Sequence, residues 1–426
     1  MELRRHLFTR PLESYIAKFS ANLAILEGKI EQIIDSPQRQ GVLEDLQPTI
    51  SALVLDQVGD SLFSIQFNSQ SRGELPPFIG ALDVIMLEMN WFMVEQWKTN
   101  GNFLSRLFFL PFLTGWKLLR LLKSVLQFRL SVLRMVLTLY WRVYRRKNEH
   151  QFDDFDKPSS MMEAVVERRV SYALSSRVSL SSVLSLVTTA YQQFKEANYH
   201  LTMFTLAGHQ TTTSSLTWTL YYLCKDEKVK QKLQAEIDDF TEQATPLSDI
   251  LTDKSVLRYL DAVIRESLRL APAAGYLGRQ ATADVQLPVR RTSGEDSTKE
   301  EEEKEQFISI PKGTNMGILV QYMHYSERYY RKAGEFIPER WLNGDNKEEM
   351  ETTADTTSCY FPFSAGNRAC FGEKYALLQM KVTLLSICSK FDFTFAHPET
   401  FCQPRHYLAQ APASFAIKFS RRRRDG

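Results

Sequence analysis

Apolar side chains recur every three or four positions along most of this chain, which is the spacing of one face of an α-helix. We expect helices at residues 46–67, 103–144, 161–174, 179–223, 226–242, 257–270 and 373–389. Runs typical of strands are shorter, and they predict strands at residues 285–289, 307–310, 316–320, 391–395 and 415–419. Residues 311–314, Pro-Lys-Gly-Thr, are typical of a turn. The pattern therefore predicts a mainly α fold with small β-sheets.

Length and composition favour one large folded domain over residues 1–426. Of these residues, 44% are hydrophobic and 24% are charged, and no segment resembles a linker. Residues 292–306 are rich in acids and contain no apolar side chain, so we expect an acidic surface loop there. Residues 421–426 form a basic tail. The five cysteines include no C-x-x-C pair, which argues for a reducing compartment and against a zinc site.

The net charge of +2 conceals one strongly basic segment. Residues 96–148 contain no Asp or Glu, and their Lys and Arg residues alternate with apolar runs such as LFFLPFLTGW. That run is much shorter than the ~20 residues that a transmembrane helix needs. The segment either lies in a membrane interface or forms core helices with solvated basic faces, and the sequence leaves both interpretations open.

One cysteine near the C-terminus lies in a loop that suits the ligation of haem iron. Residues 363–372 are FSAGNRACFG, in which Phe363, Gly366, Arg368, Cys370 and Gly372 match FxxGxRxCxG. The glycines allow the backbone to turn sharply beside a large planar ligand, and arginine offers a bidentate donor to a carboxylate. The aromatic ring offers an apolar cover for the sulfur. On this motif the chain resembles the haem-thiolate monooxygenases of the cytochrome P-450 superfamily.

The resemblance extends to residues 207–212, AGHQTT, inside the longest predicted helix. Ala207 and Gly208 are too small to block a ligand, and threonine hydroxyls can bond back to the preceding turn. In the family this segment crosses the oxygen-binding side of the haem, and Thr211 matches the threonine that helps to deliver protons. Gln210 replaces the usual acid, so we expect Thr211 with Gln210 to form the proton-delivery site. By itself the string would predict only a helix kink.

Two further motifs concern arginines. Glu266 and Arg269 are three residues apart, hence on one helix face, and the resemblance implies a structural ExxR pair joined by Arg340 of the string FIPERW. Arg279 matches a position that often binds a haem propionate, although by itself it would be a solvated strand residue. Arg368 and Arg279 would then meet two carboxylates.

At the N-terminus, Arg4 in the string LRRHL matches a propionate-binding arginine of the family. The tryptophan that usually precedes it would fall before Met1, and so would the membrane anchor or targeting segment, the first strands and a substrate-recognition loop. The resemblance therefore implies a cytochrome P-450-like haem-thiolate fold that lacks the usual N-terminal elements.

The resemblance implies a haem-thiolate monooxygenase that binds haem b (iron protoporphyrin IX) through Cys370. It would insert one oxygen atom from O2 into an apolar small-molecule substrate of lipid, sterol or terpenoid type. The implied partners are an NADPH-dependent reductase or ferredoxin-type electron donor and a membrane surface, with no nucleic acid. The expected location is the endoplasmic reticulum membrane, facing the cytosol. Two alternatives stay open: a haem-thiolate isomerase or dehydratase of peroxides, and a haem-free remnant that binds a membrane surface or a partner.

Overall fold

The structure is a computed structural model that describes residues 13–81, 115–149, 180–243, 245–249, 256–289, 306–342, 359–397, 404–406, 409–413 and 415–422. Helices dominate it. They are α2 (Glu13–Asp35), α3 (Leu46–Val58), α4 (Ser69–Arg72), α7 (Gly115–Glu149), α9 (Leu180–Lys225), α10 (Glu227–Glu242), α12 (Arg258–Leu270), α13 (Val320–His324) and α14 (Glu373–Lys390). Short π or 3₁₀ turns are η1 (Gly59–Phe63), η3 (Pro338–Trp341) and η5 (Gly366–Arg368). The mainly α prediction is confirmed.

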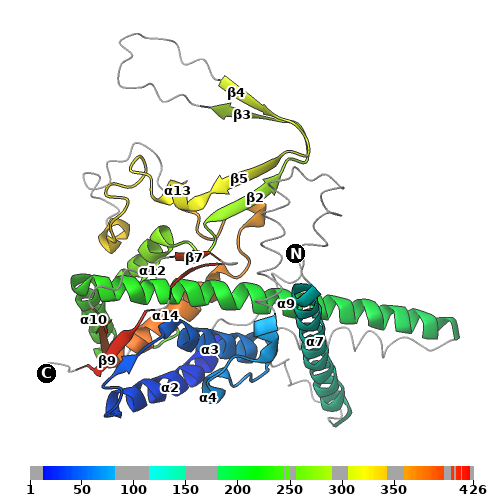
Figure 1. The fold of residues 1–426 in the computed structure, drawn as a ribbon, viewed down its shortest axis with the longest axis horizontal. Helices are drawn as coiled ribbons and strands as arrows, with labels where there is room; N and C mark the ends of the chain where they lie inside the picture. The colour runs from blue at the N-terminus through cyan, green and yellow to red at the C-terminus, as the bar shows by residue number, and fades with distance from the viewer. Residues whose placement is uncertain are drawn as a thin grey trace.

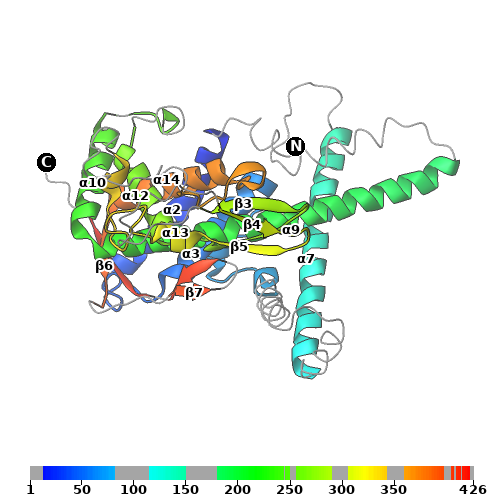
Figure 2. The same ribbon diagram turned by 90° about the horizontal axis from the view of Figure 1, so that it is seen from above.

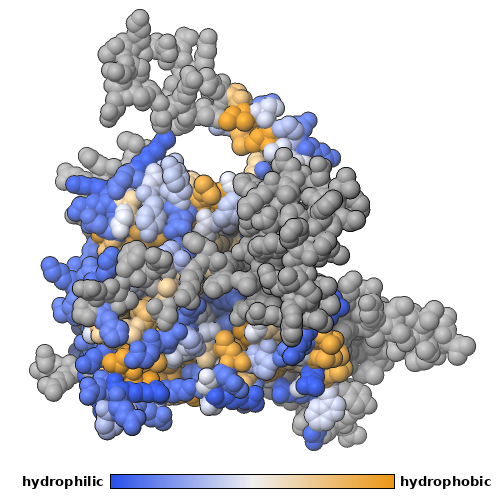
Figure 3. Space-filling model, in the orientation of Figure 1, coloured by the Kyte–Doolittle hydropathy of each residue, from blue (hydrophilic) through white to orange (hydrophobic). Residues whose placement is uncertain are grey.

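The strands of the described residues form small antiparallel sheets. They are β1 (Val42–Leu43), β2 (Tyr276–Gln280), β3 (Val285–Val289), β4 (Gln306–Ile310), β5 (Asn315–Leu319), β6 (Phe391–Phe395), β7 (Pro404–His406), β8 (Gln410–Pro412) and β9 (Ile417–Arg421). One sheet has the order β1-β9-β6, and the others pair β2 with β5, β3 with β4, and β7 with β8. The β3–β4 hairpin extends away from the helices (Figure 1), and its surface is partly apolar (Figure 3).

Helix α9 runs lengthwise through the molecule, between the other helices (Figure 1). It packs against α3, α7, α10, α12 and α14, so most of the other helices contact it directly. Its C-terminal half contributes Leu216, Leu220 and Leu223, all fully buried. Burying a leucine contributes roughly 1.5–3 kcal/mol, so the apolar contacts of this helix contribute substantially to stability. Figure 2 shows α7 crossing α9 near the N-terminal half of α9.

Capping side chains explain where two of these helices begin. The Asp226 side chain accepts a hydrogen bond from the Val229 amide at 3.1 Å, at the start of α10. The Asp45 side chain accepts one from the Gln47 amide at 3.2 Å, at the start of α3. An aspartate at this position satisfies a backbone donor that the helix itself leaves unpaired. Local sequence therefore determines both start points.

The helix predicted at residues 46–67 ends early. The α-helix stops at Val58, continues as η1 to Phe63, and is then broken at Ser64, which has a left-handed φ of 52°. A Cβ built on Gly59 would lie 2.6 Å from the Ile65 carbonyl oxygen, so the returning chain needs glycine there. The cause is a tertiary approach of backbone to backbone, which the apolar period does not encode.

Other differences concern boundaries and short elements. The strand predicted at 415–419 lies at 417–421, and the one predicted at 316–320 ends at Leu319 because Val320 begins α13. The predictions did not include α2, β2, β7 or β8. The predicted helix at 161–174, the first part of the one at 103–144, and all of the acidic loop except Gln306 lie outside the described residues.

The basic tail begins inside the fold. Arg421 ends β9 and makes two 2.7 Å hydrogen bonds to Asp35, while Arg422 pairs with Asp238. The remaining residues, 423–426, lie outside the described part.

No helix within the described ranges has a stretch long and apolar enough to cross a membrane.

Candidate functional site

The loop that carries Cys370 is closed by its own backbone. The Cys370 amide donates to the Phe363 carbonyl at 2.7 Å, and the Ser364 amide donates to the Phe361 carbonyl at 2.9 Å. Gly366 has a φ of +68°, which favours glycine because a Cβ is strained there. Gly372 has a φ of −92°, so its backbone does not require glycine. A Cβ at either glycine would meet no protein atom within 4 Å, so both positions leave room beside the sulfur.

The Cys370 thiol is the exposed one among the cysteines that the structure describes, whereas Cys224, Cys359 and Cys388 are buried. Protein atoms around the thiol still desolvate it partly, and this raises its pKa above the ordinary value. Backbone hydrogen bonds from Gly372 and Glu373, at the start of α14, act in the opposite direction. Amide donors and the positive end of a helix stabilise a thiolate over a thiol. The position therefore suits a thiolate once a cation is present.

The AGHQTT segment lies in an uninterrupted part of α9. The Thr211 hydroxyl donates to the Ala207 carbonyl at 2.5 Å, and Ala207 is exposed, so this pair faces outward from the core. Gly208 faces α3, since a Cβ built on it would lie 3.6 Å from Val58. Gln210, which lies between Gly208 and Thr211 in the helix, is half-buried.

His209 points in the opposite direction from Thr211, into the core. Its Nε2 lies 2.8 Å from the Ser51 hydroxyl of α3. Burial lowers the pKa of His209 to about 4, because an imidazolium would lose its water there. The helix therefore has a buried neutral histidine on one face and the candidate threonine on the other.

The tertiary structure brings three of these segments together. Phe204 of α9 and Phe371, next to Cys370, have ring centroids 5.9 Å apart. Arg279 of β2 donates through Nη2 to the Ser364 hydroxyl at 3.0 Å, so its guanidinium lies beside the cysteine loop. Helix α9, strand β2 and the cysteine loop thus border one site.

Arg368 is exposed and makes no hydrogen bond or ion pair with any residue that the structure describes. Arg4 lies outside the described residues.

A buried ionic cluster adjoins this site. Arg269 makes a bidentate contact with Glu266 at 2.8 and 3.0 Å, and both side chains are fully buried. Arg340 of η3 also donates to Glu266, at 3.0 Å. The remaining Arg269 donors reach the carbonyl oxygens of His324, Ala333 and Glu335 at 2.7–3.0 Å. The cluster therefore joins α12 to the segment before the cysteine loop.

Sequence reasoning missed two members of this neighbourhood. The Trp341 indole donates to Glu266 at 2.9 Å, and His324 is bonded both to Arg269 and to Phe361. Trp341 follows Arg340 directly in the FIPERW string, and this position could have indicated that it joins the same cluster. Nothing in the local pattern marks His324.

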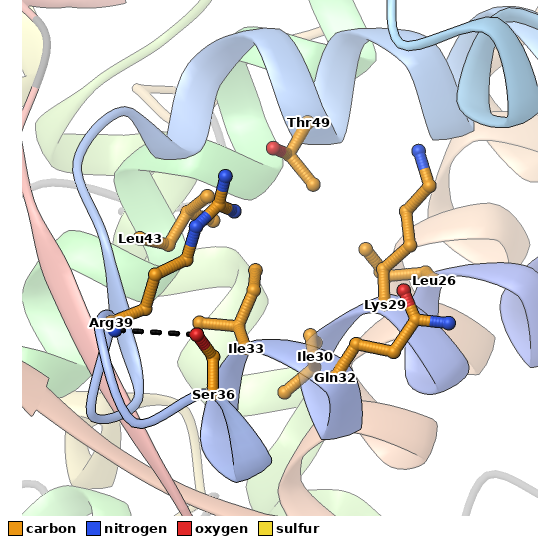
Figure 4. A pocket seen from close by; sticks show the side chains of 9 residues that line it. All are labelled: Leu26, Lys29, Ile30, Gln32, Ile33, Ser36, Arg39, Leu43 and Thr49. Atoms are coloured by element: carbon orange, nitrogen blue, oxygen red, sulfur yellow. Dashed lines mark hydrogen bonds between the residues drawn. The ribbon is translucent and has the colours of Figure 1, made fainter.

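The residues at this site fit a haem group. The exposed Cys370 thiol, amide donors beside it and two glycines without nearby atoms form a cradle for a planar iron macrocycle, which brings four nitrogen ligands of its own. Arg279 and Arg368 offer guanidinium groups for the macrocycle's carboxylates. A groove of about 440 Å³ between α2 and α3 is a separate feature, lined by four apolar side chains and by the polar or charged residues Lys29, Gln32, Ser36, Arg39 and Thr49 (Figure 4). None of the candidate residues lines it.

A helical fold built on α9, with a cysteine loop before α14 and a buried Glu–Arg pair in α12, defines a haem-thiolate class of protein. Comparison with known proteins agrees: the cytochrome P450 family profile matches residues 3–419. The chain belongs to the cytochrome P450 family, whose members are haem-dependent monooxygenases, a class of oxidoreductases, with haem b as their cofactor.

Similar proteins include cytochrome P450 3A19 of Capra hircus aegagrus, 33% identical over 193 residues, which is 45% of this chain and 76% of that protein. Cytochrome P450 4d2 of Drosophila melanogaster is 31% identical over 205 residues, 48% of this chain and 35% of its own length. Cytochrome P450 3A5 of Homo sapiens is 33% identical over 192 residues, 45% and 33% respectively. For the last two, the match therefore spans about a third of the relative.

The solved structure of the cytochrome P450DA haem domain resembles this one with a TM-score of 0.67 and 20% identity. The superposition covers 99% of this chain and 76% of the solved P450DA chain, and it supports a shared fold.

Proposed function

We propose that this chain is a haem-thiolate monooxygenase that inserts one oxygen atom from O2 into an apolar organic substrate of lipid, sterol or terpenoid type. The electrons would come from an NADPH-dependent reductase or a ferredoxin-type donor. The observation that carries the proposal is the exposed Cys370 thiol, supported by amides of Gly372 and Glu373 and next to the Phe371 ring that contacts α9.

Each candidate residue has a defined task in this proposal. Cys370 is the axial ligand, and Phe363 and the glycines shape its loop. Arg368 and Arg279, with Arg4 from the sequence, hold the propionates. When bound, the haem supplies the activation of oxygen. The Thr211 hydroxyl holds a proton at Oγ1 and can pass it on, and Gln210 orients a water but cannot ionise. Ala207 keeps the Thr211 side of α9 free of a bulky side chain, and Gly208 lies toward Val58 of α3.

The first test is Cys370→Ser. The parent chain, reduced and exposed to carbon monoxide, is expected to have the red-shifted Soret band of thiolate ligation. The variant should lose that band completely, because an alcohol is a poor iron ligand. The matched control is Cys388→Ser, since Cys388 is buried in the same C-terminal region. A variant that keeps the band, or a control that loses it, contradicts the assignment.

The same preparation separates the two enzyme classes. A monooxygenase consumes reduced nicotinamide in the presence of its reductase, O2 and substrate. An isomerase or dehydratase of peroxides converts a lipid hydroperoxide without nicotinamide. Turnover of hydroperoxide alone would favour the second class.

We also propose that α7 places the protein at a membrane surface such as that of the endoplasmic reticulum. Its buried face contains Phe128, Val132, Val136 and Leu139. A second apolar stripe is exposed and consists of Leu126, Leu130, Leu137 and Trp141. Lys123, Arg129, Arg134 and Arg145 are exposed along the same helix, and α7 has no acid before Glu149. An apolar stripe flanked by cations fits an anionic bilayer interface.

Sedimentation with vesicles tests this placement. The chain is expected to bind vesicles of anionic lipid and to dissociate as salt rises, because screening weakens the attraction of its cations. Leu130→Ser with Leu137→Ser should weaken binding roughly tenfold or more, since each leucine buries apolar surface worth over 1 kcal/mol. Leu287→Ser with Ile308→Ser is the matched control on the exposed β3–β4 hairpin. Equal losses in both pairs would contradict the role of α7.

A further inference from the structure

His324 is a fully buried side chain that joins two parts of the site. It is the last residue of α13, and its Nδ1 lies 3.0 Å from the Arg269 carbonyl oxygen. The Phe361 amide donates to Nε2 at 3.3 Å. Because a backbone amide can only donate, Nε2 must be unprotonated and Nδ1 must carry the proton that Arg269 accepts. The two contacts together require one tautomer of a neutral imidazole.

The surroundings of His324 favour that neutral form. Its ring stacks on Tyr360 with centroids 5.6 Å apart and planes at 20°, and it meets the Phe361 ring edge-on at 5.8 Å. Burial lowers the pKa of His324 to about 4, assisted by the nearby Arg269 charge and opposed by its hydrogen bond to the Arg269 backbone and by Glu266. The ring is thus uncharged near neutral pH.

Hydrogen bonds on both sides of this ring, joined by the covalent backbone, connect the ion pair to the cysteine loop. Glu266 holds the Arg269 guanidinium, which donates to the His324 carbonyl at 2.7 Å, and the imidazole then accepts from Phe361. The Phe361 carbonyl accepts from Ser364, and the Phe363 carbonyl accepts from Cys370. A second connection, from the Tyr360 hydroxyl to the Arg265 carbonyl at 3.2 Å, lies nearer the surface. The imidazole therefore joins the backbone of Arg269, whose side chain belongs to the buried ion pair, to the first residue of the cysteine turn.

We propose that His324 is a positioning residue for the cysteine ligand: by joining the Phe361 amide to the backbone carbonyl of Arg269, it sets where the loop presents the Cys370 sulfur. The part of this proposal that concerns iron rests on the proposed function. The part that concerns the loop does not, because the hydrogen bonds are made by the chain itself.

Two amide substitutions test the two hydrogen bonds of the His324 ring separately, because each keeps one bond and removes the other. The amide of His324→Gln reaches the place of Nε2, so its oxygen can still accept from Phe361. The shorter amide of His324→Asn reaches only the place of Nδ1, so it can still donate to Arg269 but not meet Phe361. Tyr360→Phe is a third variant, which removes the outer connection alone.

The first readout is the alkylation rate of Cys370 by iodoacetamide in the haem-free, full-length chain, with Cys402 replaced by Ser. Cys224, Cys359 and Cys388 are buried and should react slowly. His324→Asn should change the Cys370 rate about fivefold, the factor that corresponds to one lost hydrogen bond. His324→Gln and Tyr360→Phe should stay within about twofold of the parent. Equal rates in the Asn and Gln variants, whether altered or not, would overturn the proposal.

The second readout is the share of thiolate-type band in the reduced, carbon-monoxide-bound form. In His324→Asn, part of the haem should lose thiolate ligation, so the share of this band should fall. In His324→Gln, the share should stay as in the parent. If the parent itself has no such band but the alkylation pattern holds, the proposed function fails and the positioning role stands. If His324→Asn does not fold, His324→Gln decides: parental rate and band support the role, and loss of both overturns it.

Discussion

Two neighbouring groups of polar residues in this molecule differ in their burial and in their hydrogen-bond partners. Around Arg269, charged groups are fully buried and nearly every donor has a partner within the protein. Around Cys370, the thiol and Arg368 are exposed, and Arg368 has no partner among the described residues. The first group uses its polar atoms to hold segments together, while the second leaves them exposed, as the proposed haem site requires.

This contrast separates a structural motif from a binding motif. A buried ion pair stabilises a fold only if all its hydrogen bonds are made, because the cost of desolvation is otherwise too large. A binding site needs polar groups that are still available when the protein has folded. The same residue type, arginine, therefore joins segments at position 269 and is exposed at position 368, where we propose that it binds a propionate.

Removing the acid of the buried cluster should have the largest effect on stability. Glu266→Ala leaves the charges of Arg269 and Arg340 without their carboxylate, and we expect a loss of roughly 3–5 kcal/mol in the free energy of unfolding. Soluble yield and haem content should fall together. Chemical denaturation of the purified chain measures the loss.

The matched control is Lys332→Ala, which breaks an ion pair with Glu335 at 3.7 Å in which both side chains are about 60% exposed. An exposed pair contributes at most about 1 kcal/mol. Similar losses in the two variants, or a stable and haem-loaded Glu266→Ala chain that is only slow in turnover, would contradict the structural role of Glu266.

A smaller effect is expected from acid. The pKa values of His209 and His324 are both lowered to about 4 by burial. An unfolded histidine has a pKa near 6.5, so the unfolded chain binds these protons first as pH falls. Stability should therefore decrease from about pH 6.5 towards pH 4, by roughly 1 kcal/mol for each histidine between pH 7 and pH 5.5.

Denaturation of the parent and of His209→Gln at those two pH values checks this expectation. Glutamine keeps a polar partner for Ser51 but binds no proton, so the variant should lose less stability than the parent over the same interval. An identical slope in both chains would mean that His209 binds its proton equally well in the folded and unfolded states, which contradicts the lowered pKa.

Thr211 should matter least for folding and most for chemistry. Thr211→Ala removes an outward-facing hydrogen bond to Ala207, so we expect less than about 0.5 kcal/mol of change in stability. The ratio of product formed to nicotinamide consumed should fall as reduced oxygen is diverted to peroxide. Thr211→Ser, which keeps the hydroxyl, is the control. An unchanged ratio in Thr211→Ala would assign proton delivery to another group.

Gln210→Glu is the companion variant. A carboxyl group can exchange protons with solvent, whereas an amide only orients water. The rate should stay equal or rise, with a shifted pH dependence. A loss of rate at every pH would contradict the supporting role of Gln210.

Local sequence determined the parts of this protein that depend on neighbouring residues. The apolar period predicted α9, α10, α12 and α14 to within a few residues, because each helix has one face in the core and a cap or break at its ends. The offset between Glu266 and Arg269 was likewise informative, since residues three apart share a helix face. The cysteine loop was identified through its resemblance to the haem-thiolate monooxygenases.

Tertiary structure alone decided how these parts meet. Helix α3 ends where it does because the backbone of Ile65 packs against Gly59. Strand β5 ends at Leu319 because α13 begins at Val320, and α13 places His324 beside Arg269. Whether an arginine is buried in a cluster or exposed for a ligand depends on which segments pack over it, and those segments are distant in sequence. Spacing along the chain determined the motifs, and long-range packing determined which of their polar atoms were satisfied within the protein and which stayed exposed.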